Sequence, residues 1–103
     1  MYYKYLSFMG KKDFSEAELV ALAEKFKVLS EVSRLKIINT LTEGEICVKD
    51  IISRTELQQP NVSKQLKILM QAGIVSCRAE GLLKYYSLQD FTILQICNAV
   101  CGK

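Results

Sequence analysis

Apolar side chains recur every three or four residues in the first third of the chain, which is the spacing of an amphipathic helix. The first stripe follows Ser15, where the sequence SEAE is typical of a capping box between Ser15 and Glu18. Phe14 and Leu19 flank this cap as a hydrophobic staple. The positions expected to face inward are Leu19, Leu22, Ala23, Phe26 and Leu29. The pattern therefore predicts a first helix that begins at Ser15.

A second stripe predicts a helix that has Ser30 as its N-cap and is broken at Gly44. Its expected inward positions are Val32, Leu35, Ile38 and Leu41. A short third helix is expected over residues 47–54.

The stretch TELQQ then predicts a tight turn before a fourth helix over residues 60–72. Pro60 stands where the first helical position tolerates a missing N–H, and Gly73 stands where a helix ends. The inward positions of this helix are Val62, Leu66 and Leu69.

Two apolar runs, IVSCRA and LLKYYSL, flank Glu80 and Gly81 and predict a β-hairpin. Asp90 is expected to cap a last helix from Phe91 to about Cys101. The order of elements predicts a mostly α fold with a small β-hairpin wing, a winged helix-turn-helix of about five helices and two strands. Residues 1–103 are expected to form a single domain.

The entrance to the fourth helix carries many hydrogen-bonding side chains and no acid. These polar residues are Gln58, Gln59, Asn61, Ser63, Lys64 and Gln65. A recognition helix enters the major groove by its N-terminal end, where such side chains can bind base edges or phosphate. We therefore expect this helix to read duplex DNA.

The basic surplus of the chain lies in the same region. The formal net charge is +3, and residues 59–87 hold four basic side chains, Lys64, Lys67, Arg78 and Lys84, against Glu80 alone. A localised positive patch is the footprint of a polyanionic partner. We expect Arg78 and Lys84 of the wing to bind the phosphate backbone.

Composition excludes several classes of function. The chain has no histidine, so imidazole metal sites and Cys-His or Ser-His catalysis are excluded, and no paired carboxylates or C-x-x-C motif point to an enzyme. It contains no apolar run of membrane-spanning length and no signal-peptide pattern, and its four cysteines suit reduced thiols. The sequence therefore favours a cytoplasmic protein that is not an enzyme and does not bind a membrane.

The segments LSEVSRLKIINTLTEGEICVKDI and QPNVSKQLKILMQAGIVSCRAEGLLKYYSL resemble the ArsR/SmtB family of small winged-helix repressors. The resemblance implies a homodimer, built from the first and last helices, that binds a palindromic operator. Carried over by position, it assigns the base-contacting end of the recognition helix to Gln59, Pro60, Val62, Ser63 and Lys64. Together with the polar tip and the basic patch, the candidate DNA contacts also include Asn61, Lys67, Arg78 and Lys84. A winged-helix module that binds proteins rather than DNA is the alternative.

The resemblance also implies an effector, usually a metal ion or a thiol modifier, but both standard metal sites are incomplete. Cys47 matches the first cysteine of the "CVC" motif, whereas Lys49 replaces the second. Asp90 matches the aspartate of the last-helix site, whereas Thr92 replaces its first histidine.

Cys97 and Cys101 are therefore the candidate sensor, with Cys47 a possible third thiol. Four residues apart, they share one face of the last helix. We expect no obligatory cofactor and a soft metal or metalloid effector, such as arsenite, cadmium, lead or zinc. Oxidation or persulfide chemistry at the same thiols is one alternative. The other is that both cysteines only pack as small hydrophobes.

Overall fold

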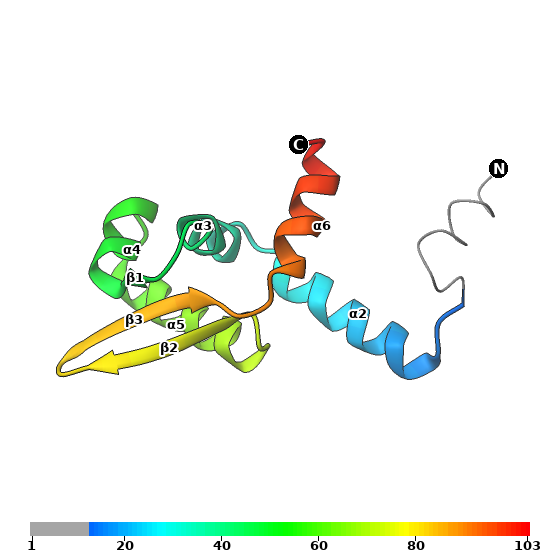
Figure 1. Cartoon of the computed structure of the whole chain (residues 1–103), viewed down its shortest axis with the longest axis horizontal. Helices are drawn as coiled ribbons and strands as arrows, with labels where there is room; N and C mark the ends of the chain where they lie inside the picture. Colours follow the sequence, from blue (N-terminus) through cyan, green and yellow to red (C-terminus); the bar gives the residue numbers. More distant parts are fainter. Residues whose placement is uncertain (1–12) are drawn as a thin grey trace.

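The computed structural model describes residues 13–103, in which the chain forms five α-helices and three β-strands (Figure 1). The helices are α2 (Glu16–Leu29), α3 (Val32–Thr40), α4 (Val48–Thr55), α5 (Gln59–Gln71) and α6 (Thr92–Cys101), and the strands are β1 (Ile46–Cys47), β2 (Val75–Glu80) and β3 (Leu83–Leu88). This is the predicted mostly helical fold with a β-hairpin wing. Among the helices of residues 13–103, none combines the length and the hydrophobicity of a membrane span.

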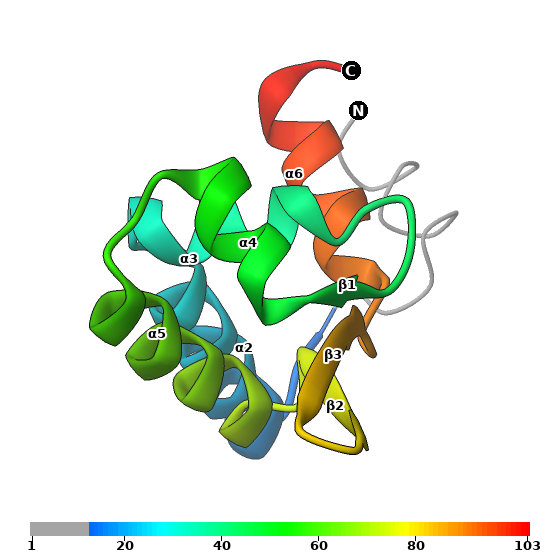
Figure 2. The same ribbon diagram turned by 90° about the vertical axis from the view of Figure 1, so that its left-hand side faces the viewer.

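Helices α3, α4 and α5 surround one hydrophobic core, and the sheet lies beside α5 (Figures 1 and 2). The largest fully buried side chains are Ile37, Leu41, Ile51, Val62, Leu66, Leu69, Ile74, Val75 and Ile93. Val62, Leu66 and Leu69 are the inward positions that the sequence predicts for α5. Burying an aliphatic side chain of this kind contributes roughly 1.5–3 kcal/mol, so this face fixes α5 to the body of the domain.

The first helix is capped as predicted. The Ser15 hydroxyl accepts from the Glu18 amide at 3.1 Å, and the Glu18 carboxylate accepts from the Ser15 amide at 2.9 Å. The predicted Ser30 cap of the next helix is wrong, because Ser30 ends α2 and Glu31 caps α3 by accepting from the Ser33 amide at 2.8 Å.

Several predicted inward positions are exposed. Val32 and Leu35 of α3 have 66% and 37% of their surface exposed, whereas Ile37, which the stripe omitted, is completely buried. In α2 only Leu29 is buried, and Leu19, Leu22 and Phe26 stay exposed. Helix α2 extends away from the α3–α5 core (Figure 1), which agrees with the exposure of Leu19, Leu22 and Phe26.

The end of α5 is closed by the predicted glycine. Gly73 has a φ of 74°, and its amide donates to the Met70 carbonyl oxygen at 3.0 Å. The next amide, of Ile74, donates to the Leu69 carbonyl oxygen at 3.0 Å, which completes a Schellman motif. The chain then enters β2 with Ile74 and Val75 buried.

The predicted hairpin is confirmed, and its sheet has one more strand than expected. Strands β2 and β3 pair in register from Val75 opposite Leu88 to Glu80 opposite Leu83, so the turn is Gly81–Leu82. Strand β1 pairs with β3 and gives the order β1-β3-β2. With two residues, β1 is too short to be predicted from an alternating pattern of apolar and polar side chains.

The last helix begins at Thr92, one residue later than predicted, and Asp90 serves its first turn. The Asp90 carboxylate accepts from the Thr92 amide at 3.0 Å and from the Thr92 hydroxyl. Its other oxygen accepts from the Lys25 ammonium at 2.9 Å, which joins α6 to α2. The hydrogen bond from the Thr92 hydroxyl has the largest effect and the bond from Lys25 the next largest, and both hold the pKa of Asp90 below its usual value.

Asp90→Asn is expected to lower the free energy of unfolding at neutral pH by up to about 1 kcal/mol, because the ion pair with Lys25 is lost. Since the folded pKa is depressed, the contribution of the carboxylate is complete above the unfolded value of about 4 and disappears as the pH falls through the folded value. Thermal unfolding of both proteins from pH 7 to pH 2 should show their difference vanish in acid. The control Asp13→Asn changes an exposed carboxylate and should track the parent; a pH-independent gap for Asp90→Asn would contradict the assignment.

Candidate nucleic-acid interface

Helices α4 and α5 form a helix-turn-helix unit joined by residues 56–58. The Thr55 hydroxyl donates to the Ile51 carbonyl oxygen at 2.8 Å, and Glu56 then takes a left-handed φ of 59°. Gln58 is the N-cap of α5 but makes no side-chain cap bond, and no acid lies in the first turn. An uncovered, acid-free helix N-terminus favours an anion such as phosphate.

The exposed residues of α5 gather on the face that turns away from the core. In its first three turns they are Gln59, Pro60, Ser63, Lys64 and Lys67, and Gln71 is exposed at its C-terminal end. Figure 2 shows α5 beside the β2–β3 hairpin on one face of the molecule. Within residues 13–103, Lys64, Lys67 and Lys84 form no ion pair, so their charges are available to a polyanion.

Two of the predicted contacts face the wrong way for DNA. Val62 has no exposed surface and belongs to the core, so its predicted role as a side-chain DNA contact is wrong. Asn61 is half-buried and turns toward α3, where its amide nitrogen donates to the Ser33 hydroxyl at 3.4 Å. Its amide oxygen accepts from Gln65 at 2.8 Å. In this conformation both polar atoms of Asn61 are engaged inside the protein.

Arg78 of the wing is exposed but paired with acids. Its guanidinium donates to the two Glu45 carboxylate oxygens at 3.1 and 2.9 Å, and also to Glu80. It lies 4.8 Å from the centre of the Tyr85 ring. The hydrogen bonds to Glu45, which have the larger effect, and to Glu80 raise the pKa of Arg78. The same bond to Arg78 lowers the pKa of Glu45. No sequence pattern predicts the pairing of Arg78 with Glu45, because the two residues are 33 positions apart.

The two cysteines of α6 meet at an apolar hollow of about 320 Å³ between α2, α3 and α6. Cys97 is half-buried and Cys101 is exposed. The other lining residues are Phe26, Leu29, Ser30, Leu35, Ile96 and Val100. The two thiols that the sequence singles out therefore line one hollow, together with Phe26 of the exposed α2 stripe.

The remaining cysteines lie in the sheet. Cys47 belongs to β1 and Cys77 to β2, opposite Tyr85 and Tyr86 of β3. Cys47 lines a hollow with Glu43, Glu45 and Asp50, apart from the hollow at α6. In the part of the chain that the structure describes, no three His, Cys, Asp or Glu side chains gather as a metal site.

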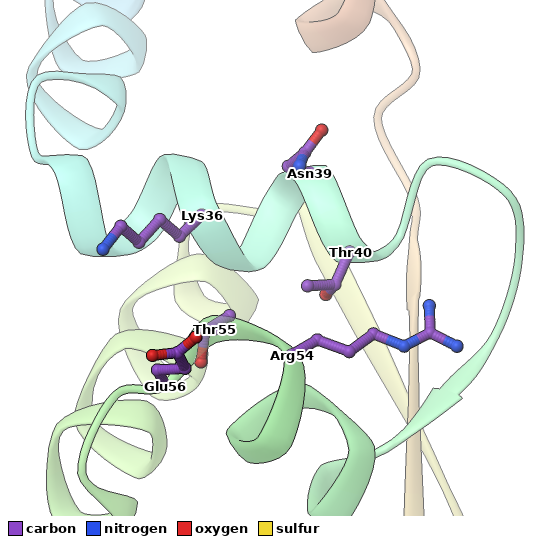
Figure 3. A pocket seen from close by; sticks show the side chains of 6 residues that line it. All are labelled: Lys36, Asn39, Thr40, Arg54, Thr55 and Glu56. Atoms are coloured by element: carbon purple, nitrogen blue, oxygen red, sulfur yellow. The ribbon is translucent and has the colours of Figure 1, made fainter.

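A polar hollow of about 490 Å³ lies between α3 and α4 (Figure 3). Lys36, Asn39 and Thr40 line it from α3, and Arg54, Thr55 and Glu56 from α4 and the turn. The Thr40 and Thr55 hydroxyls donate to carbonyl oxygens of their own helices. The mixed charges and the engaged hydroxyls indicate no particular ligand.

Comparison with known proteins places the helix-turn-helix in a family. Residues 31–76 match the family described as "Bacterial regulatory protein, arsR family". The chain is 39% identical over 88 residues to a cadmium resistance transcriptional regulatory protein CadC homolog from Staphylococcus aureus, and the match covers 84% of this chain and 73% of that protein.

Solved structures agree in fold. The transcriptional repressor BigR from Xylella fastidiosa superposes with a TM-score of 0.76 and 33% identity, covering 82% of this chain and 87% of that one. A homodimeric winged helix-turn-helix DNA-binding domain from Mycobacterium bovis, a possible ArsR-family regulator, superposes with a TM-score of 0.75 and 29% identity. That match covers 90% of this chain and 86% of the other.

Glu45→Gln is expected to strengthen the binding of any duplex about two- to five-fold, because phosphate then competes with one carboxylate fewer for Arg78. Binding to a random-sequence duplex over a salt series measures this. The control Glu43→Gln removes the same charge from the same loop without a bond to Arg78. Equal gains in the two variants would mean that only net charge matters and that Arg78 does not reach phosphate.

Proposed function

The chain belongs to the arsR family of bacterial regulatory proteins, and from this premise we propose that it is a transcriptional repressor that binds an operator duplex as a homodimer and releases it on reaction with a thiol-directed effector. The observation that carries the DNA-binding part is the acid-free tip of α5, which is exposed beside the wing and accompanied by Lys64, Lys67 and Lys84, none of which forms an ion pair with a residue between 13 and 103. Such a protein works in the cytoplasm, where the operator is, and is not an enzyme.

In the proposed complex the N-terminal half of α5 lies in the major groove. Gln59, Ser63 and Lys64 reach base edges, because they are exposed: the Gln59 amide and the Ser63 hydroxyl can both donate and accept hydrogen bonds, and the Lys64 ammonium can donate them. Lys67 and Lys84 bind phosphate, which supplies affinity without sequence preference. Arg78 joins them once phosphate replaces Glu45 and Glu80.

We further propose that residues 1–103 act as one domain that dimerises through its first and last helices. Exposed Leu19, Leu22 and Phe26 on α2, together with Val100 on α6, leave an apolar surface that a second copy would cover. The relative from Mycobacterium bovis is described as homodimeric, which supports this arrangement. Two-fold symmetry would set the two recognition helices about 34–36 Å apart, the distance between successive major grooves.

The effector is proposed to act at Cys97 and Cys101, with Cys47 outside this site. Positions i and i+4 of a helix have Cβ atoms about 5–6 Å apart, whereas a disulfide needs about 3.5–4.5 Å. A soft metal or metalloid needs no such closure, because thiolates bind it at about 2.3 Å. Since one chain offers two thiols here, a fuller ligand set would combine both copies. The Staphylococcus aureus relative is described as a cadmium resistance regulator, which favours a metal over oxidation or persulfide chemistry.

Selection from a random duplex library should yield a preferred palindromic sequence, and sedimentation of the complex should give two chains per duplex. Ser63→Ala and Lys64→Ala should each reduce discrimination by about 1–3 kcal/mol, because base contacts are lost. Lys84→Ala should weaken all duplexes alike and reduce the salt dependence of binding. If the parent protein bound no duplex at low salt, the protein-interaction alternative would replace this proposal.

The variant Cys97→Ser/Cys101→Ser should bind the selected duplex as the parent does but keep it in the presence of cadmium, arsenite, lead or zinc ions, and of peroxide or polysulfide. The parent should release the duplex with at least one of these reagents. Cys47→Ser and Cys77→Ser are the matched controls and should respond like the parent. A double variant that still responds would place the sensor elsewhere and leave Cys97 and Cys101 as packing residues.

A further inference from the structure

One polar side chain of the recognition helix is buried. Gln65 has 5% of its surface exposed, although its neighbours Ser63 and Lys64 face solvent. A buried amide that lacks hydrogen-bond partners destabilises the folded state, so the bonds that Gln65 makes to its surroundings matter. The partners of Gln65 therefore constrain how α5 sits on the domain.

Both ends of the Gln65 amide are bonded. Its oxygen accepts from the Arg34 guanidinium at 2.9 Å, and its nitrogen donates to the Asn61 oxygen at 2.8 Å. Asn61 in turn donates to the Ser33 hydroxyl at 3.4 Å. The bonds from Arg34 and to Ser33 connect α3 with α5 at two points one helical turn apart, which opposes rotation of α5 about its own axis.

Arg34 also holds the end of α2. Its Nε donates to the Val28 carbonyl oxygen at 2.6 Å, in the last turn of α2, while its Nη1 serves Gln65. A Glu31 oxygen lies 3.8 Å from the same guanidinium. One rigid, largely buried group therefore joins three helices, and a lysine could not reproduce it, because a single ammonium cannot span two acceptors in a fixed plane.

We propose that Arg34 is a positioning residue for DNA reading, which fixes the recognition helix α5 against α2 and α3 through Gln65. The inference rests on the proposed function and adds a residue that touches no base. The apolar face of Val62, Leu66 and Leu69 holds α5 in the core, and the Arg34–Gln65 bond sets the angle at which Gln59 and Ser63 are presented. Arg34 also ties that angle to α2, on which the proposed dimer is built.

A double-mutant cycle on the full chain tests this with the duplex that the parent selects and a scrambled duplex of equal length. The variants are Arg34→Lys, Gln65→Met and the pair combined. The measured quantity is the ratio of the two affinities, with thermal unfolding recorded alongside. Arg54→Lys and Gln71→Met are matched controls, because they make the same chemical changes at exposed positions outside the Arg34–Gln65–Asn61 contacts.

Each single variant should lower the affinity ratio at least about tenfold, the size of one lost base contact, with little change in binding to the scrambled duplex. The combined variant should lose no more than the worse single variant, because each single variant already removes the Arg34–Gln65 bond on which the affinity ratio is proposed to depend. Should Arg34→Lys fail to fold, Gln65→Met removes the same bond from the other side.

If the folded variants kept the affinity ratio of the parent, even with lower unfolding temperatures, Arg34 would be only a structural residue and the inference would be overturned. Losses that multiply in the combined variant would also overturn it, since the two residues would then act independently. If the parent selected no duplex, the proposed function itself would fall and this inference with it.

Discussion

The division of α5 into a buried face and an exposed face is the constraint on which the rest of the structure depends. Val62, Leu66 and Leu69 are completely or almost completely buried. Their burial anchors α5, whose opposite face is exposed to solvent. Because core positions recur every three or four residues along a helix, the side chains between them are exposed, and these are the ones that we propose bind DNA. Lys64 and Lys67 remain outside for this reason.

Apolar packing alone does not define the rotation of such a helix about its own axis. Aliphatic contacts are non-directional, so a core of this kind tolerates small rotations, whereas hydrogen bonds to buried groups do not. The contacts of Arg34, Gln65 and Asn61 place directional bonds along the boundary between the core and the proposed DNA face. The wing is held in a comparable way, with Arg78 bonded to Glu45 of the preceding loop.

The opposite end of the molecule exposes apolar side chains of α2 and α6. Helix α2 buries only Leu29, and the apolar hollow that contains Cys97 and Cys101 is lined in part by Phe26 and Leu29 of that helix. If a second copy covers this surface, as we propose, the geometry of the dimer and the chemistry of Cys97 and Cys101 would be coupled. The Lys25–Asp90 ion pair joins α2 to the start of α6, so a movement of one helix would shift the other.

The sequence by itself determined what depends on neighbouring residues. The Ser15 capping box, the Gly73 helix end, the hairpin and the inward face of α5 all follow from spacings of a few residues, and all are present. The tertiary structure decided what depends on residues far apart in the chain. In the folded chain Val62 is buried, so its side chain has no surface for DNA. Strand β1 pairs with β3, and Val32 is exposed. The tertiary structure also paired Arg34 with Gln65 across 31 positions and Arg78 with Glu45 across 33, because local periodicity carries no record of which helix or loop will lie opposite a side chain.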